Sequence, residues 1–177
     1  MSLVAGVPTE GGVIPLFIAD DWVFLIKPPK LLVHPNEFAR KEPNLRAIVR
    51  RGLDGPVHTV HRIDRATSGL VLMARSPESA SMISEQFRNR TVGKRYLALL
   101  RGHLGEPTKV DRPVKRDRRD PTPADAVSYI EPLAWGTIPE PVGKFSEGWF
   151  TLASIILETG RHHQARKHCH YISHPII

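Results

Sequence analysis

The stretch that decides the fold is His61-Arg62-Ile63-Asp64-Arg65-Ala66-Thr67-Ser68-Gly69-Leu70. It runs directly into Val71-Leu72-Met73-Ala74-Arg75, an apolar run of strand length. Because Thr67-Ser68-Gly69 is typical turn sequence, we predict a loop that leads into a strand. The single carboxylate of the loop, Asp64, lies among three basic side chains, and nearby positive charge favours an ionised carboxylate. The loop therefore offers a nucleophile or base for a polyanionic substrate; an ordinary surface loop with an Asp–Arg pair is the alternative.

Composition sets the broad class of the protein. The chain has 177 residues, of which 41% are hydrophobic, and this suits one domain with a proper core. Its net charge of +7 makes nucleic acid the leading partner and a membrane surface the second. No apolar run is long enough to cross a membrane, and no signal peptide is apparent. The single cysteine, Cys169, excludes an internal disulfide and fits a reducing, cytoplasmic setting.

In the first half of the chain, residues 16–18 and 22–26 are predicted to be strands around an Asp-Asp turn, with Lys27-Pro28-Pro29 ending the second. A short helix is predicted over residues 43–51, and a strand over 57–60 leads into the central loop. A second helix is expected to begin at Ser76, since Ser is a favoured N-cap and Pro follows it at the first helical position.

In the second half, residues 94–100, 126–130 and 148–157 are predicted to be strands. Alternation along the first of these places Tyr96 with Ala98 and Leu100 on one side. Residues 109–120 are rich in charge and are predicted to be an exposed loop, either a solvated turn or a phosphate-contacting patch. Residues 135–145, with two prolines and two glycines, are also predicted to be a loop. After a turn at Gly160, a helix is expected to carry His163, Arg166 and His170 near one face.

Three motifs in this order resemble the RluA family of pseudouridine synthases, cofactor-free enzymes that isomerise uridine in RNA. The first is the central loop at residues 61–70. The second is Lys94-Arg95-Tyr96-Leu97-Ala98, and the third is Glu158-Thr159-Gly160-Arg161-His162-His163-Gln164-Ala165-Arg166-Lys167-His168. The resemblance extends over residues 16–177, and three ordered motifs make an accidental match improbable.

The resemblance implies an α+β fold: a mixed, mostly antiparallel sheet with packed helices and a central catalytic cleft. Residues 1–15 would be an N-terminal extension, and residues 16–177 the catalytic domain. Many relatives have a small RNA-binding domain ahead of the catalytic one, which we expect to be absent here. Relatives continue beyond the position of Ile177 into further strands, so we expect the catalytic domain to be truncated at its C-terminus.

The resemblance also assigns the site residues. Asp64 would be the catalytic nucleophile, Arg166 would pair with it, and Tyr96 would lie over the target base, whereas spacing alone makes Tyr96 a core aromatic. No cofactor or metal is required, and a zinc site among the C-terminal histidines is disfavoured because paired Cys and HExxH spacings are absent. The residues expected to bind substrate are His61, Arg62, Arg65, Thr67, Ser68, Gly69, Arg161, His163 and Gln164.

The substrate expected from the resemblance is tRNA. With no N-terminal RNA-binding domain expected, and with the sequences at residues 110–115 and 172–177, the chain is most similar to the branch of the family that modifies tRNA near the acceptor stem. Ribosomal RNA is the alternative substrate. A catalytically silent RNA-binding protein is the alternative from a different functional class. No protein partner is implied.

Overall fold

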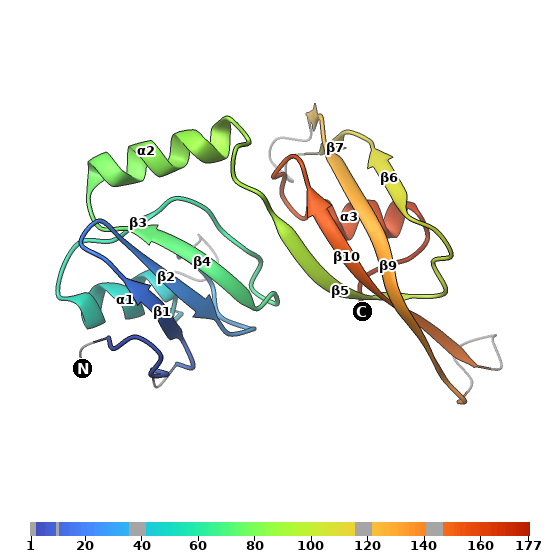
Figure 1. The fold of residues 1–177 in the computed structure, drawn as a ribbon, viewed down its shortest axis with the longest axis horizontal. Coiled ribbons are helices and arrows are strands. Elements are labelled where there is room, and N and C mark those ends of the chain that lie inside the picture. Colours follow the sequence, from blue (N-terminus) through green and yellow to red (C-terminus); the bar gives the residue numbers. More distant parts are fainter. Residues whose placement is uncertain (1–2, 10, 36–41, 116–121, 141–146) are drawn as a thin grey trace. The chain divides into compact units, whose positions relative to one another are not determined.

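The computed structural model describes residues 3–9, 11–35, 42–115, 122–140 and 147–177. The chain divides into two compact units, unit 1 (Met1–Thr91) and unit 2 (Val92–Ile177), and each is described by itself (Figure 1). The predicted α+β class is confirmed, since both units combine antiparallel sheet with helix. The described strands form two four-stranded sheets and one two-stranded ribbon.

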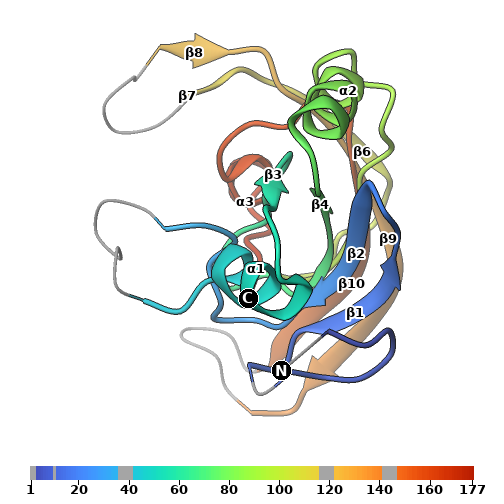
Figure 2. The ribbon, with the colours of Figure 1, turned by 90° about the vertical axis from the view of Figure 1, so that its left-hand side faces the viewer.

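Unit 1 is built on a sheet with the strand order β1-β2-β4-β3, in which every ladder is antiparallel. Two helices accompany this sheet, and Figure 2 shows α2 above it and α1 beside its lower part. The elements are β1 (Ile14–Ile18), β2 (Trp22–Lys27), α1 (Leu45–Leu53), β3 (His58–Thr59), β4 (Gly69–Ala74) and α2 (Pro77–Arg88).

The core face of this sheet follows from the two-residue period of its strands. Val23 and Leu25 of β2 are fully buried and pair with Met73 and Val71 of β4, which are also fully buried. Lys27 continues the same alternation at the end of β2 and is likewise 0% exposed. The apolar face of unit 1 therefore ends on a lysine.

Both predicted helices of unit 1 are present: α2 begins after Ser76 as the sequence predicts, whereas α1 begins two residues later than the predicted range of 43–51 and ends two residues later. In α1 the side chain of the N-cap Asn44 accepts a hydrogen bond from the backbone N–H of Ala47 at 3.0 Å. In α2 the side chain of Ser76 accepts from the backbone N–H of Ser79, and Ser79 reaches back to the N–H of Ser76, which completes a capping box. The two capped helix starts, at Asn44 and Ser76, lie on either side of the central loop in the sequence.

Unit 2 is built on a second antiparallel sheet, with the strand order β5-β10-β9-β6, beside the two-stranded ribbon β7-β8 (Figure 1). One helix, α3, lies against the sheet. The elements are β5 (Arg95–Arg101), β6 (Thr108–Asp111), β7 (Val114–Lys115), β8 (Pro123–Ala124), β9 (Val127–Ile138), β10 (Gly148–Leu157) and α3 (Gln164–Tyr171).

The core of unit 2 lies between α3 and one face of this sheet. Cys169 of α3 is fully buried in the cluster that contains Leu100, Ile130 and Ile155, and burial raises the pKa of its thiol to about 12. Tyr96 packs against the same cluster. The predicted alternation of β5 is thus confirmed, with Leu97 and Leu99 on the exposed side.

Two predicted loops prove partly wrong. Within residues 109–120, the stretches up to Asp111 and from Val114 to Lys115 are strand, and residues 116–120 lie outside the described part of the chain. Here Val110 points inward between the exposed Lys109 and Asp111, so the charges conceal a strand of period two.

Within residues 135–145, β9 continues to Ile138, and residues 141–145 are outside the described part. The long partner strand β10 explains the difference, because Thr151 pairs with Trp135 and Trp149 pairs with Thr137. A ladder to a neighbouring strand thus continues through Gly136, although the glycines and prolines of this segment indicated a loop.

Candidate active site

The central loop, predicted at residues 61–70, occupies residues 60–68 in the structure, where it connects β3 to β4 in unit 1. Asp64 opens a tight turn, in which the backbone N–H of Thr67 donates to the Asp64 carbonyl at 3.1 Å. Ile63 is buried beside it and anchors the turn to the unit. Gly69 ends the loop with φ of +133°, a conformation that side chains of L residues rarely adopt. The sequence before β4 is therefore shaped to present Asp64 on a fixed turn.

Arg65, the residue after Asp64, is held by contacts of both its side chain and its backbone. Its Nε donates to the Lys30 carbonyl at 3.1 Å, and its guanidinium pairs with Glu42 at 2.8 Å. The ion pair is half exposed, so it contributes little to stability. The Arg65 carbonyl accepts from the buried Nζ of Lys27 at 3.3 Å. The turn that carries Asp64 is thus tied to the segment that follows β2.

His61 lies at the start of the loop and faces the protein. Its Nε2 accepts the backbone N–H of Leu72 at 2.9 Å, and its ring stacks on Phe87 of α2 with centroids 4.7 Å apart. Burial lowers the pKa of His61 from 6.5 to about 4, so the ring is neutral at physiological pH. The strand predicted over residues 57–60 is shorter in the structure, where it spans His58–Thr59. It ends there because the backbone N–H of Leu72 donates to the imidazole of His61 and not to a backbone carbonyl of the neighbouring strand.

Two of the predicted catalytic residues lie in unit 2. Tyr96, on β5, is half-buried and packs against the unit 2 core. Arg166 lies in the first turn of α3 and is exposed. Both side chains lie on regular elements of unit 2, whereas Asp64 lies on a loop of unit 1.

A chain of buried hydrogen bonds fixes the start of α3. Thr159 accepts the N–H of Val127 and donates to Oε1 of Gln164 at 2.7 Å. The Nε2 of Gln164 donates to the Ser128 hydroxyl, which contacts Nδ1 of His168 at 2.8 Å. The other ring nitrogen, Nε2 of His168, contacts the carbonyl of Arg112 at 3.0 Å.

The partners in this chain also fix the tautomer of His168. A carbonyl only accepts, so Nε2 of His168 carries the proton and Nδ1 accepts from Ser128. Burial lowers the pKa of His168, in keeping with this neutral form. The polar side-chain atoms of Gln164 and His168 therefore all have hydrogen-bond partners inside unit 2. These bonds hold the helix that carries Arg166.

The remaining predicted residues of the third motif are placed around the start of α3. Arg161 donates from Nε to the carbonyl of Asp125 at 2.9 Å. His163 is the N-cap of α3, with φ of +55°, and its ring stacks on His162 with centroids 3.8 Å apart. His163 was predicted to lie within the helix and instead precedes it by one residue. Arg62 and Ser68 of the first motif are exposed, and Thr67 is half-buried.

Sequence reasoning missed Lys27 and Ser128 as parts of the site's support. A signal for Lys27 was present in the alternation of β2, because positions 23, 25 and 27 share the buried face. Ser128 gave no signal of its own, since its role depends on α3 packing beside β9.

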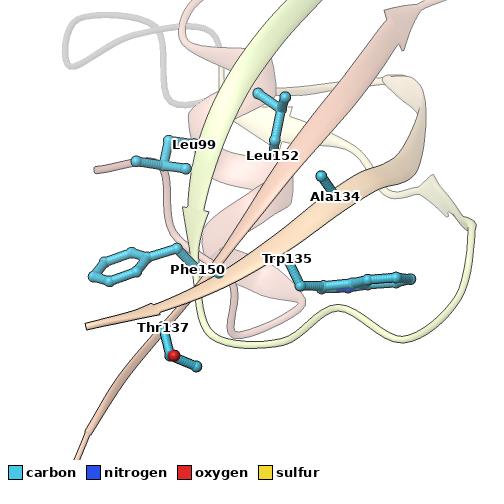
Figure 3. A pocket seen from close by; sticks show the side chains of 7 residues that line it. Leu99, Ala134, Trp135, Thr137, Phe150 and Leu152 are labelled. Atoms are coloured by element: carbon cyan, nitrogen blue, oxygen red, sulfur yellow. The ribbon is translucent and has the colours of Figure 1, made fainter. Parts of the chain in front are cut away.

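Outside the motifs, a shallow apolar pocket lies on the sheet of unit 2 between β5, β9 and β10 (Figure 3). Its lining includes Leu99, Trp135, Phe150 and Leu152, and it contains no charged side chain. In the part of the chain that the structure describes, no group of three or more His, Cys, Asp or Glu side chains is arranged to hold a metal ion. Among the described residues, none of the helices has the length and apolar character needed to cross a membrane.

Comparison with known proteins assigns the family. Residues 21–171 match the sequence profile of the family described as RNA pseudouridylate synthase. The chain belongs to this RNA pseudouridylate synthase family. A Yersinia pestis protein named tRNA pseudouridine synthase C is 37% identical over 161 residues, which cover 85% of this chain and 63% of that protein. A Haemophilus ducreyi protein of the same name is 33% identical over 172 residues, covering 92% of this chain and 70% of that protein. The chain thus spans about two thirds of the length of these relatives.

Solved structures of RNA pseudouridylate synthases share the fold. Human RNA Pseudouridylate Synthase Domain Containing 1 aligns with a TM-score of 0.77 at 21% identity, over 97% of this chain and 69% of that one. Human RNA Pseudouridylate Synthase Domain Containing 4 aligns with a TM-score of 0.71 at 24% identity, over 92% of this chain and 66% of that one. The family resemblance seen in the three motifs is therefore confirmed by both the sequence and the fold.

Proposed function

We propose that this protein isomerises uridine to pseudouridine in RNA, with Asp64 as the nucleophile. The observation that carries the proposal is the fixed turn of the central loop, on which one carboxylate is presented among basic side chains. Membership of the RNA pseudouridylate synthase family supports it, as do relatives named tRNA pseudouridine synthase C.

The proposed reaction requires one carboxylate as its essential catalytic group. Asp64 attacks the nucleoside or assists elimination, the glycosidic bond breaks, the uracil turns, and C5 bonds to the sugar. The product is an isomer of the substrate, so no electrons are gained or lost. A uridine in structured RNA must first leave its stack, which costs a few kcal/mol. Arg62, an exposed cation two residues before Asp64, is proposed to fill the gap or hold the backbone.

Two residues of unit 2 complete the proposed chemistry. Tyr96 is proposed to stack on the uracil, and Arg166 to pair with Asp64 and orient its carboxylate. The match of the second and third motifs to the family and the placement of both residues on regular elements, β5 and α3, support these roles.

The predicted substrate-binding residues divide by what they already contact. His61 and Gln164 have their polar atoms engaged inside the protein, and Gly69 supplies a backbone conformation, so these three are proposed to hold the site in shape. The other six are proposed to contact RNA: Arg62, Arg65, Thr67, Ser68, Arg161 and His163. Arg65 and Arg161 also make hydrogen bonds within the protein, through their Nε atoms.

The proposed substrate is tRNA, modified in the cytoplasm. The two relatives quoted above carry tRNA in their names and match most of this chain. An excess of basic over acidic side chains, 25 against 18, suits a polyanionic partner.

Tritium release tests this proposal directly, because moving the sugar bond to C5 expels the hydrogen there. The purified protein is incubated with tRNA or ribosomal RNA labelled with tritium at C5 of uridine, and pseudouridine is mapped by mass spectrometry. We expect release from tRNA and none from the Asp64→Asn variant. Release from ribosomal RNA alone would reassign the substrate. RNA binding with no release from either RNA would mean a silent RNA-binding protein.

A further inference from the structure

Arg112 and Tyr171 form the closest contact between a cation and an aromatic ring in the described part of the chain. The guanidinium carbon of Arg112 lies 3.9 Å from the centroid of the Tyr171 ring, whereas Nζ of Lys109 lies 5.7 Å from the ring of Tyr129. Arg112 is exposed, and Tyr171 is 55% exposed. A guanidinium stacked on a ring keeps its N–H edges open. The stack therefore presents an oriented cation at the surface of unit 2, outside the three motifs.

The guanidinium of Arg112 differs from those of other arginines in unit 2. Arg95 and Arg161 each donate from Nε to an oxygen of the protein. Among the described residues, no hydrogen bond or ion pair engages the guanidinium of Arg112. The neighbouring carboxylate, Asp111, contacts Nζ of Lys109 at 3.7 Å. Arg112 thus keeps its charge and its N–H donors for a ligand.

The backbone of Arg112 is fixed as well as its side chain. Its N–H donates to the carbonyl of Ala126 at 3.0 Å, and its carbonyl contacts Nε2 of the buried His168 at 3.0 Å. Lys167 donates to the carbonyl of Lys115 at 2.7 Å, so α3 holds this segment at three points, one of which is the stack. A cation that is already held in place loses little conformational entropy when a ligand binds.

The helix that holds Arg112 also carries a residue of the candidate active site. Arg166 lies in the first turn of α3, and Tyr171 is its last residue. A rise of about 1.5 Å per residue places the stack about 7.5 Å further along the helix axis. Lys167, four residues before Tyr171, lies on the same face as the ring and adds a second positive charge. A polyanion that reaches Arg166 therefore meets the stack at the other end of α3.

We propose that Arg112, held by the ring of Tyr171, binds a phosphate of the RNA backbone near the target uridine. The proposal rests on the proposed function, which supplies the RNA and the uridine. A guanidinium donates two parallel N–H bonds to phosphate oxygens, and such contacts position a nucleic acid without reading its sequence. Tyr171 acts through Arg112 by fixing the plane of the guanidinium. Loss of either side chain is therefore expected to weaken RNA binding and to leave the chemical step unchanged.

The first test compares Arg112→Ala with Arg101→Ala. Arg101 is exposed and follows Leu100, which packs against α3, so alternation directs Arg101 to the opposite face of the sheet. The affinities for tRNA and for an unrelated RNA are measured at several salt concentrations. We expect Arg112→Ala to weaken the binding of both RNAs on the order of tenfold at low salt. The slope of the salt dependence should fall by about 0.7–0.9, as for one phosphate contact.

Arg101→Ala should keep the wild-type affinity and slope. Unchanged affinity and slope in Arg112→Ala would overturn the proposal. Equal losses in Arg112→Ala and Arg101→Ala would also overturn it, because they would reflect net charge and not a site. A loss confined to one of the two RNAs would refute a phosphate contact.

A second test asks whether Tyr171 acts through Arg112. Tyr171→Leu removes the ring, whereas Tyr171→Phe keeps it. We expect Tyr171→Leu to weaken tRNA binding by about two- to fivefold, as for an exposed cation–π contact, and Tyr171→Phe to bind like wild type. In the Arg112→Ala background, Tyr171→Leu should have no further effect. Equal losses from Tyr171→Leu in both backgrounds would refute the role of the stack.

Single-turnover tritium release at saturating tRNA separates this proposal from the proposed function. We expect Arg112→Ala to keep the wild-type rate within about threefold, since saturation compensates for weaker binding. A larger loss of rate at saturation would place Arg112 in the chemical step and overturn its role in binding alone. Wild type that binds RNA without release would refute the proposed function, whereas normal release together with wild-type affinity in Arg112→Ala would refute the phosphate contact alone. If thermal melting shows that Arg112→Ala does not fold, Arg112→Gln, which is polar and uncharged, replaces it with the same expectations.

Discussion

The Nε2 atom of His61 accepts the backbone N–H of Leu72 at 2.9 Å. This hydrogen bond lies one residue beyond Met73, the last position at which β3 pairs with β4, so a side chain continues a strand ladder. The nitrogen accepts only while it is unprotonated, and stacking on Phe87 keeps the ring out of water. The entrance to the loop of Asp64 is therefore secured by a neutral histidine.

Unit 1 is expected to lose stability in mild acid because of His61. Its folded pKa, about 4, lies below the ordinary 6.5, so the unfolded chain binds more protons between these values. The stabilisation is complete above pH 6.5 and is lost as the pH falls towards 4, by on the order of 2 kcal/mol. Urea unfolding at pH 7.5 and 5 measures it. His61→Gln, which retains an acceptor, should show a weaker pH dependence, and the exposed His170→Gln should match wild type. An unchanged dependence in His61→Gln would contradict the assignment.

Asp64→Asn is expected to abolish turnover while tRNA affinity stays within a few-fold of wild type. An amide has nearly the shape of the carboxylate, so the turn closed by Thr67 N–H should persist, but the amide is a poor nucleophile. Single-turnover tritium release and filter binding give the two quantities. Turnover in the Asn variant would remove Asp64 from the role of nucleophile.

The sequence predicts the fold best where hydrophobic residues alternate regularly or where a helix start has a typical capping sequence. The apolar alternation of β2 and the Ser-Pro start of α2 predicted their elements correctly. The charged residues on either side of Val110 hid β6, because a strand with a single buried residue among charges resembles a solvated loop in sequence. The strand at Trp135 depends on pairing with β10, which is a tertiary effect.

The candidate site likewise combines features that the local sequence predicts with features that depend on tertiary contacts. The three motifs named the residues, since a motif preserves local chemistry. They did not show that His61 and Gln164 point inward, because the partners of these side chains, Leu72, Ser128 and Val127, belong to strands brought near by folding. A polar residue in a functional motif can therefore serve the fold of the site and not its ligand.

Alkaline pH should affect the stability and the activity of the protein in opposite directions through Lys27. Its folded pKa, about 8, lies below the ordinary 10.5, so the unfolded chain binds more protons between these values and stability rises with pH there. The gain over the whole range from pH 8 to 10.5 is on the order of 3 kcal/mol, of which about 2 kcal/mol is reached by pH 9.5. Turnover should fall over the same range, because a neutral amine loses one donor and its attraction to Asp64. Urea unfolding and single-turnover rates between pH 7.5 and 9.5 measure both. Identical pH trends in wild type and Lys27→Met would contradict this.

RNA affinity is expected to depend strongly on salt, given the net charge of +7. The logarithm of the binding constant should fall linearly with the logarithm of salt concentration, by about 0.7–0.9 per phosphate contact. If the exposed Arg62 contacts a phosphate, Arg62→Ala should reduce this slope by about one contact for all RNA sequences alike. Binding titrations at several salt concentrations test it, with the exposed Arg88→Ala at the last residue of α2 as the control. A flat plot for wild type would exclude phosphate-driven binding.

Gln164→Leu is expected to destabilise unit 2 without weakening RNA binding by the folded protein. The side chain of Gln164 accepts from Thr159 and from the N–H of Arg161, and donates to Val127 and Ser128. Leucine has a similar volume but leaves these buried groups without partners, at about 1–3 kcal/mol for each group left unsatisfied.

Urea unfolding should show this loss as a lower midpoint with an unchanged slope. Arg161→Ala serves as the comparison, because it removes a half-buried cation proposed to contact RNA and, among the described residues, one side-chain hydrogen bond, to the carbonyl of Asp125. It should weaken tRNA binding more than it lowers stability, whereas Gln164→Leu should do the reverse. A Gln164→Leu protein that unfolds like wild type but binds tRNA poorly would place Gln164 at the RNA surface and refute its assignment as internal support.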